Sequence, residues 1–238
     1  MFKRHTPTWV LGCALACACT AYAADPVTDA LVAANAPYRV ALYKTNSQSQ
    51  TEAEQALAQA QKAWQALRDR FGDQPPAPYN QDPEFASTLR RVAEVYTTAL
   101  GQVQAGELSR AHASLEAVRD LTAALRERNQ IVVFSDHMND YHAQMEHLLT
   151  DGTALLDTPQ GWTELTAQTG VLRYLAARLQ SKAGADLKGN PEFVQKLKSV
   201  MASVAQLEHA VWARDAEATR NALQQLKKPY SQLFAQFG

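Results

Sequence analysis

The sequence predicts an all-α protein of two tandem antiparallel up-and-down four-helix bundles that follow a cleaved signal peptide. Apolar residues recur every three or four positions through most of the chain, which is the spacing of one buried helix face. Residues 82–85 (DPEF) return as residues 190–193 (NPEF), and the similarity continues without a gap beyond them. The β-prone stretch 131–134 (IVVF) is isolated, so no sheet is expected.

Residues 1–23 have the composition of a secretory signal peptide. Lys3 and Arg4 precede an apolar run at 9–18, and Ala21-Tyr22-Ala23 forms an A-x-A cleavage site. We therefore expect export to a bacterial periplasm, with cleavage near Ala23. Cys13 weakly resembles the cysteine of a lipoprotein signal, but it lies inside the apolar run, so export without a lipid anchor is the preferred interpretation.

The composition beyond the signal excludes several classes of function. The cysteines are Cys13, Cys17 and Cys19, so removal of the signal leaves no disulfide and no thiolate metal site. Without Lys3 and Arg4 the chain has 21 basic and 24 acidic residues, a balance that does not favour nucleic acid or an anionic membrane surface. No later apolar run is long enough to cross a bilayer.

The internal repeat predicts corresponding helices in the two halves. Each pair of helices carries its apolar stripe at equivalent positions, with only Gln168 breaking the pattern. The first stripe is Phe85, Leu89, Val92, Tyr96, Ala99 and Val103, matched by Phe193, Leu197, Val200, Val204, Leu207 and Val211. The second is Leu108, Ala111, Leu115, Val118 and Leu125, matched by Ala216, Thr219, Leu223, Leu226 and Leu233. The third is Leu57, Ala60, Trp64, Leu67 and Phe71, matched by Leu165, Gln168, Leu172, Leu175 and Leu179.

One more helix is needed to close the core of each half. In the first half, residues 37–47 supply it, with 27–34 adding a turn or two. In the second half it is the stretch 136–150, with Ser135 or Asp136 as the N-cap. The predicted join is near Asn129, which gives domains at 24–130 and 131–238, each of an ordinary domain size. The fourth helix could also continue directly into the fifth.

Each half resembles cytochrome b562, a periplasmic four-helix-bundle haem protein. The resemblance rests on a half of about this length that ends in an acidic-Pro-Glu-Phe helix, a short turn and an Ala-rich helix. In that family a Met of the first helix and a His of the last bind the haem iron from opposite faces. The stretch 136–140 (DHMND) resembles the family's opening segment and places Met138 at the axial Met. Ser231 stands where the family has its axial His, and Ala123 stands there in the first half.

The stretch 135–147 (SDHMNDYHAQMEH) concentrates His and Met residues and has two interpretations. In the first, Met138 and Met145 continue an apolar stripe and fill the core, with the histidines beside it. In the second, Met138, His142, Met145 and Glu146 share one side of a helix and bind a metal, with His137 nearby. Thioethers and imidazole suit copper, especially Cu(I). Met138 and His142 cannot bind opposite faces of one haem, because they lie on the same side of one helix.

The sequence thus predicts a non-enzymatic periplasmic protein that binds copper or haem, for carriage, buffering or electron transfer. No catalytic signature is present, and no Glu-x-x-His pair supports a di-iron site. The competing prediction is a module without a cofactor that recognises another periplasmic protein through its helix faces. Neither the oligomeric state nor the identity of such a partner follows from the sequence.

Overall fold

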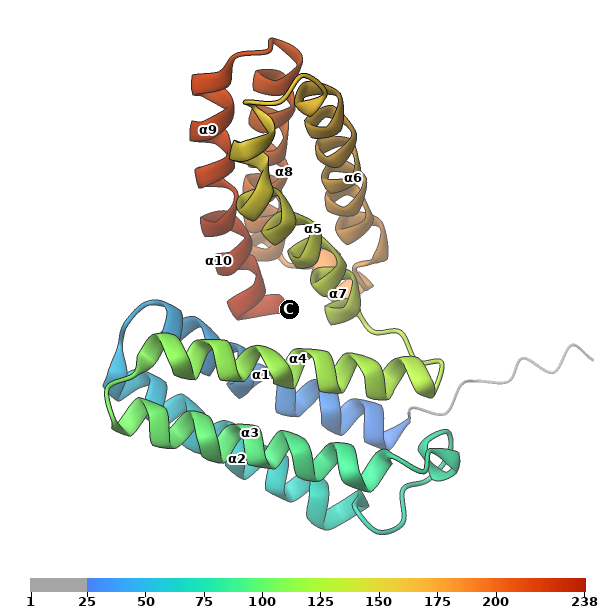
Figure 1. Ribbon diagram of the computed structural model, residues 1–238. Helices are drawn as coiled ribbons and strands as arrows, with labels where there is room; N and C mark the ends of the chain where they lie inside the picture. The colour runs from blue at the N-terminus through green and yellow to red at the C-terminus, as the bar shows by residue number, and fades with distance from the viewer. Residues whose placement is uncertain (1–24) are drawn as a thin grey trace, which may run out of the picture.

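The computed structural model describes residues 25–238, and the protein is all-α over this range (Figure 1). The predicted signal peptide, with Cys13, Cys17 and Cys19, lies outside the described residues. The helices are α1 (Pro26–Asn46), α2 (Gln50–Phe71), η1 (Tyr79–Gln81), α3 (Phe85–Gln104), α4 (Leu108–Arg128), α5 (Phe134–Leu155), α6 (Gly161–Lys182), α7 (Ala185–Gly189), α8 (Pro191–Trp212), α9 (Ala216–Gln225) and α10 (Lys227–Phe237). Between residues 25 and 238 no helix is long and apolar enough to cross a membrane.

The helices pack in two groups. In the first helix group, α1 to α4, α1 packs against α2 and α4, and α3 packs between α2 and α4. In the second helix group, α5 to α10, α8 packs against α6, α9 and α10, and α5 closes the ring against α6 and α9. Figure 1 shows the second group standing crosswise on the first, over α1 and α4. Their contact therefore has α1 and α4 on one side and parts of α5 and α10 on the other.

The sequence repeat reappears as a shared side-chain bond before helices α3 and α8 and a shared turn after them. Asp82 Oδ1 accepts a hydrogen bond from the Glu84 N–H at 2.9 Å, and Asn190 Oδ1 accepts the equivalent bond from Glu192 at 2.9 Å. The two turns between the repeated helices also share a left-handed residue, with φ of 77° at Gly106 and 52° at Arg214. Both halves therefore share this side-chain bond before the helix and the left-handed turn after it, although α8 begins directly after Asn190 and α3 begins only at Phe85.

Several predicted helix boundaries are corrected by the structure. Helix α1 runs unbroken through Pro37 instead of dividing into two pieces. The N-cap of α5 is Val133, and Asp136 is the third helical residue, whose carboxylate accepts the Val133 N–H at 3.0 Å. Helix α4 does not continue into α5, because the chain turns at Gln130 with a φ of 57°.

The last predicted helix is also divided in two. Helix α9 ends at Gln225 and α10 begins at Lys227, just before Pro229. Proline has no N–H and its ring collides with the carbonyl four residues earlier, which here belongs to Gln225. On α6, the buried residue of the third stripe is Thr169, while Gln168 is only half-buried. The polar residue that broke the pattern therefore lies beside the core.

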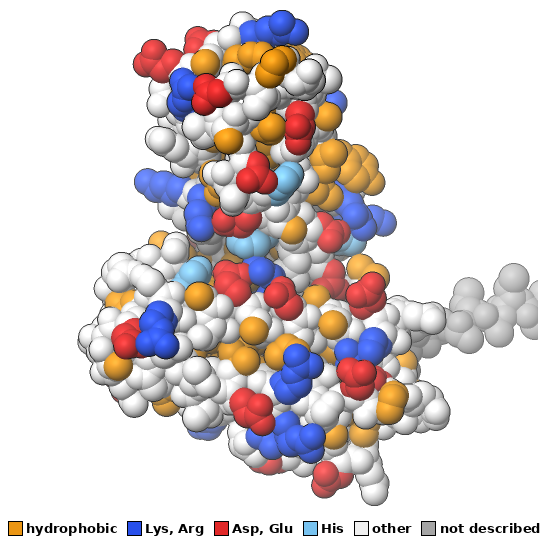
Figure 2. Space-filling model, viewed as in Figure 1, with side chains coloured by type: hydrophobic (Ala, Val, Ile, Leu, Met, Phe, Trp, Pro, Cys, Tyr) orange, Lys and Arg blue, Asp and Glu red, His pale blue; other side chains and the backbone are white. Residues whose placement is uncertain are grey.

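Three sets of polar contacts join the two helix groups. Arg126, which is 6% exposed, donates from Nε to both oxygens of Asp136 at 3.1 and 3.0 Å. The backbone oxygen of Gly238 accepts from Asn35 Nδ2 at 3.2 Å and also from the Arg39 guanidinium. The third set surrounds a small cavity at the centre of the contact. Figure 2 shows histidine and acidic side chains gathered where the groups meet.

Candidate functional site

The five metal ligands predicted on α5 lie in different surroundings. Met138 and Met145 are fully buried in the hydrophobic core. His137 is 8% exposed, and burial lowers its pKa. His142 lies at the contact between the helix groups, and Glu146 pairs with Lys227 of α10 at 3.0 Å. The structure thus separates the two thioethers from the imidazole of His142, and both methionines take the core positions expected from the apolar stripe.

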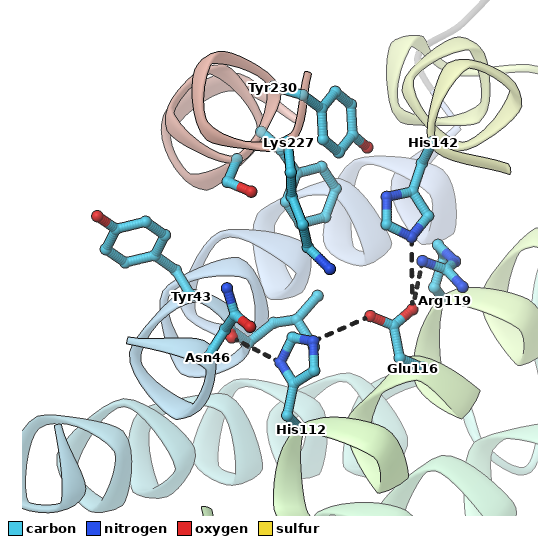
Figure 3. Close-up of a pocket in the computed structure, with 11 residues that line it drawn as sticks. Tyr43, Asn46, His112, Glu116, Arg119, His142, Lys227 and Tyr230 are labelled. Carbon is cyan, nitrogen blue, oxygen red and sulfur yellow. Dashed lines mark hydrogen bonds and ion pairs between the residues drawn. The ribbon is translucent and has the colours of Figure 1, made fainter. Parts of the chain in front are cut away.

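The cavity between the helix groups collects polar side chains from four helices, α1, α4, α5 and α10 (Figure 3). Its volume is about 40 Å³, enough for a few water molecules. Apolar side chains, Leu42 and Phe234 among them, form part of its wall. Its charged and polar lining includes His112, Glu116 and Arg119 of α4, His142 of α5, and Lys227 and Tyr230 of α10.

The imidazole of His112 is oriented by the backbone of α1. Its Nδ1 lies 3.1 Å from the carbonyl oxygen of Leu42 and 3.3 Å from Thr45 Oγ1. A carbonyl oxygen can only accept, so Nδ1 carries the hydrogen in this contact. In the neutral ring the lone pair is then on Nε2, which faces Glu116 Oε1 at 3.5 Å.

Glu116 stands between the two histidines. His142 Nε2 lies 3.9 Å from Glu116 Oε2, on the opposite carboxylate oxygen from the one that faces His112. Arg119, one turn further along α4, forms an ion pair with the same Oε2. That oxygen is buried, and although the guanidinium is adjacent, the pair lacks hydrogen-bond geometry. The carboxylate is therefore balanced by charge but incompletely hydrogen-bonded.

His142 is held against an aromatic side chain. Its ring centroid lies 5.3 Å from that of Tyr230, whose hydroxyl donates to the Met138 carbonyl at 3.1 Å. Burial lowers the pKa of His142 to about 4, and the Arg119 cation adds to the effect. The ring is therefore neutral at neutral pH, although its Nδ1 is buried without a hydrogen-bond partner. Neutral imidazole is the form that binds metal ions.

The cluster offers two imidazole nitrogens and one carboxylate from two different helix groups. Imidazole and carboxylate are donors for zinc and Cu(II), whereas thioethers favour Cu(I). Within the described range no three His, Cys, Asp or Glu side chains already converge into a group able to hold a metal. The donors surround a common space without being drawn together, and Arg119 adds a competing positive charge there.

The donors present do not fit the haem ligation of the cytochrome b562 family. The family's axial His position holds Ser231, whose side chain lines the cavity, and serine has no imidazole. Met138 is completely buried in the packed core. We therefore derive no chemistry through a haem.

Two residues of the cluster, His112 and Glu116, were absent from the ligands expected from the sequence. A signal for them does exist. The pattern His-Ala-x-(Leu or Met)-Glu occurs twice, as His112 to Glu116 and as His142 to Glu146. Each copy places its His and Glu on one side of a helix, one turn apart. The copies are not related by the internal repeat, so alignment of the two halves does not reveal them.

No family model, curated protein or solved structure matches this chain. The strongest feature available is the cluster between the two helix groups.

Proposed function

We propose that this chain is an exported, non-enzymatic metal-binding protein of the periplasm, with copper as the first candidate metal and carriage or buffering as its role. The observation that carries the proposal is His142, a half-buried imidazole with a pKa of about 4 that lines the cavity together with His112 and Glu116. Metal ions bind neutral imidazole, and His142 Nε2 lies 3.9 Å from Glu116 Oε2, a buried carboxylate oxygen without a hydrogen-bond partner.

The proposal includes a tandem architecture, with a signal peptide at 1–23 and four-helix bundles at 24–130 and 131–238. The ring of contacts in each helix group supports this division. The repeated side-chain bonds at Asp82 and Asn190, and the repeated left-handed turns at Gly106 and Arg214, support descent of both bundles from one ancestral unit. The resemblance to cytochrome b562 is proposed for the fold, without its haem.

Metal titration of the exported protein tests this function. Calorimetry and elemental analysis with Cu(II), Cu(I) and Zn(II) should give one ion per chain, with affinity lost in His142→Ala. His209→Ala is the matched control, because His209 is exposed on α8. Met138→Leu decides whether a thioether takes part, since a core methionine tolerates that change. Unchanged affinity in both Met138→Leu and His142→Ala would refute the site around α5.

An interaction module without a cofactor is the second candidate. The observation that favours it is the exposure of Val171 and Tyr174 on α6, at 47% and 65%. Exposed aromatic side chains are common at protein interfaces. A protein that binds none of the three ions, and whose spectrum stays colourless, would favour this candidate.

A further inference from the structure

Helix α6 packs on α5 and α8 through one side, and its opposite side is exposed. That outward side includes Val171 and Tyr174, with 47% and 65% of their surfaces exposed. Ala167, Gly170 and Ala177 lie beside them, so this side of the helix is apolar and flat around one projecting ring. Figure 2 shows hydrophobic side chains gathered over α6. Exposed apolar surface of this kind is typical of a contact with another protein.

Gly170 lies in the middle of α6, where nothing inside the fold requires a glycine. An added Cβ at this position would meet no neighbouring atom within 4 Å. Glycine in the interior of a helix lowers stability relative to alanine. The missing side chain leaves a notch on the helix surface one turn from Tyr174. A partner can therefore approach the backbone of α6 more closely here than elsewhere along the helix.

Opposite charges stand at the two ends of this outward side. Glu164 and Lys182 are eighteen residues apart, which is about five helical turns, so both lie on the same side of α6. Both are exposed, and neither forms an ion pair within residues 25–238. The other cations of the helix, Arg173 and Arg178, already pair with carboxylates of α8 and α5. An antiparallel pair of α6 helices brings Glu164 of each close to Lys182 of the other, whereas a parallel pair brings like charges together.

We infer that this side of α6 joins two copies of the chain in an antiparallel homodimer, with Tyr174 of each copy over Gly170 of the other. A two-fold interface must be complementary to itself, and α6 carries a projection, a notch and both charges on one surface. This register places Glu164 opposite position 180 of the second copy, about 3 Å along the helix from Lys182. Two long side chains span that difference. The inference is independent of the proposed metal binding.

The dimer is expected to be reversible. A single pair of helices buries a small area, and small interfaces are typical of weak, transient association. We therefore expect a Kd in the micromolar range. Two-fold symmetry places each substituted residue in the interface twice, so a single substitution has a large effect on dimerisation.

Sedimentation equilibrium of the metal-free exported protein over a range of concentrations tests the inference. Tyr174→Ser should weaken dimerisation at least about tenfold, because a central tyrosine contributes much of the binding energy of an interface. Gly170→Ala should also weaken it at least about tenfold, because the added methyl group fills the notch. At low concentration, where the chain is monomeric, Gly170→Ala should raise the midpoint of thermal unfolding by about 2 °C, because alanine favours the helix. Stability and dimerisation therefore change in opposite directions.

Gly101→Ala is the matched control. Gly101 is exposed in α3, and an added Cβ there also meets nothing within 4 Å. The substitution should give a similar rise in the unfolding midpoint and leave dimerisation unchanged. An equal loss of dimerisation in Gly101→Ala and Gly170→Ala would overturn the α6 interface.

Charge reversal tests whether the occupant is a second copy. In Glu164→Lys and in Lys182→Glu, each chain presents like charges at both ends of α6, so each variant alone should dimerise more weakly than the parent protein. An equimolar mixture of the two variants should associate about as tightly as the parent protein, because each positive end then meets a negative one. Absence of association in the mixture would overturn the antiparallel arrangement.

The remaining outcomes separate the inference from the proposed function. A parent protein that stays monomeric at about 1 mM would overturn the dimer. A dimer whose Kd is unchanged in Tyr174→Ser and in Gly170→Ala would overturn its location on α6. Copper titration of the same proteins is read separately: a monomeric chain that binds copper overturns the dimer alone, and a dimer that binds no metal overturns the proposed function alone.

Discussion

His142 of α5 and Glu116 of α4 face each other across the contact between the two helix groups, with Nε2 and Oε2 3.9 Å apart. The imidazole also lies against Tyr230, which is fixed to the backbone of Met138. A single side chain of the second group is thus in contact with both its own core and the charged surface of the first group.

The stability of the metal-free protein should fall as the solution becomes acidic. The pKa of His142 is about 4 in the folded protein, below the unperturbed value near 6.5. Between these values the unfolded chain binds a proton that the folded protein excludes, so stability present above pH 6.5 is lost toward pH 4. The expected loss from this group is at most about 3 kcal/mol. Urea unfolding at several pH values measures this loss. The free energy of unfolding of His142→Gln should depend less on pH between about 4 and 6.5. An equal dependence on pH in that variant would contradict the role of His142.

Met138 should behave as a core residue in unfolding experiments. Its side chain is fully buried, so Met138→Leu keeps most of the packed volume and should cost less than about 1.5 kcal/mol. Met138→Ala leaves a cavity and should cost about 2–5 kcal/mol. Thermal and urea unfolding of the metal-free proteins give both values. A Leu variant as unstable as the Ala variant would show that the methionine sulfur has a role beyond packing.

The ion pair of Arg126 with Asp136 should contribute measurably to stability. Arg126 is almost completely buried, so Asp136→Ala leaves an uncompensated charge and should cost at least about 2 kcal/mol. The exposed pair of Arg110 with Glu107 is the control, and Glu107→Ala should change stability by less than about 1 kcal/mol. A double-mutant cycle with Arg126→Met isolates the pair. Equal losses of stability in Asp136→Ala and Glu107→Ala would show that the buried pair stabilises the fold no more than the exposed pair does.

Arg214→Gly should stabilise the protein. Arg214 adopts a φ of 52°, a region that costs a residue with a Cβ roughly 1 kcal/mol, and its side chain is exposed. We expect a gain of about 0.5–1 kcal/mol on chemical unfolding. Gly106→Ala, at the equivalent turn of the first half, should have the opposite sign. Loss of stability in Arg214→Gly would mean that contacts of the arginine side chain stabilise the fold by more than its left-handed backbone conformation costs.

Arg119→Met should raise the affinity for Cu(II). The guanidinium forms an ion pair with Glu116 Oε2 and places a positive charge in the cavity where we propose that the metal ion binds. Its removal should tighten binding about tenfold, measured by competition with a chelator of known affinity. The exposed Arg110 provides Arg110→Met as the control. Weaker copper binding in Arg119→Met would indicate that Arg119 orients the carboxylate instead of competing with the ion.

Much of the fold was predictable because helix periodicity is a local property. Phe85, Val92 and Tyr96 were assigned to one buried face from their spacing alone, and all three are buried. The errors occur where tertiary contacts compete with local signals. Proline at position 37 is accommodated inside α1, whereas Pro229 divides α9 from α10. Nothing local distinguishes these two prolines.

The candidate site was only partly predictable for the same reason. His142 stood out because it lies in a stretch rich in His and Met. His112 lies off the apolar stripe of its helix, where a histidine is usually exposed. Its importance arises from the approach of α5 to α4, and periodicity within one helix contains no information about which helix faces it.

The bonds from Arg39 and Asn35 to Gly238 have a consequence for the order of folding. They join residues about 200 positions apart in the chain, whereas each helix group is closed mostly by neighbours in sequence. Contacts between distant residues form slowly, because the chain must first lose the entropy of a long loop. The two helix groups should therefore become compact in a fast kinetic phase and dock in a slower one. Protection of amide hydrogens in α1 near Arg39 should then lag behind protection in α2 and α3 when refolding is followed by pulsed hydrogen exchange.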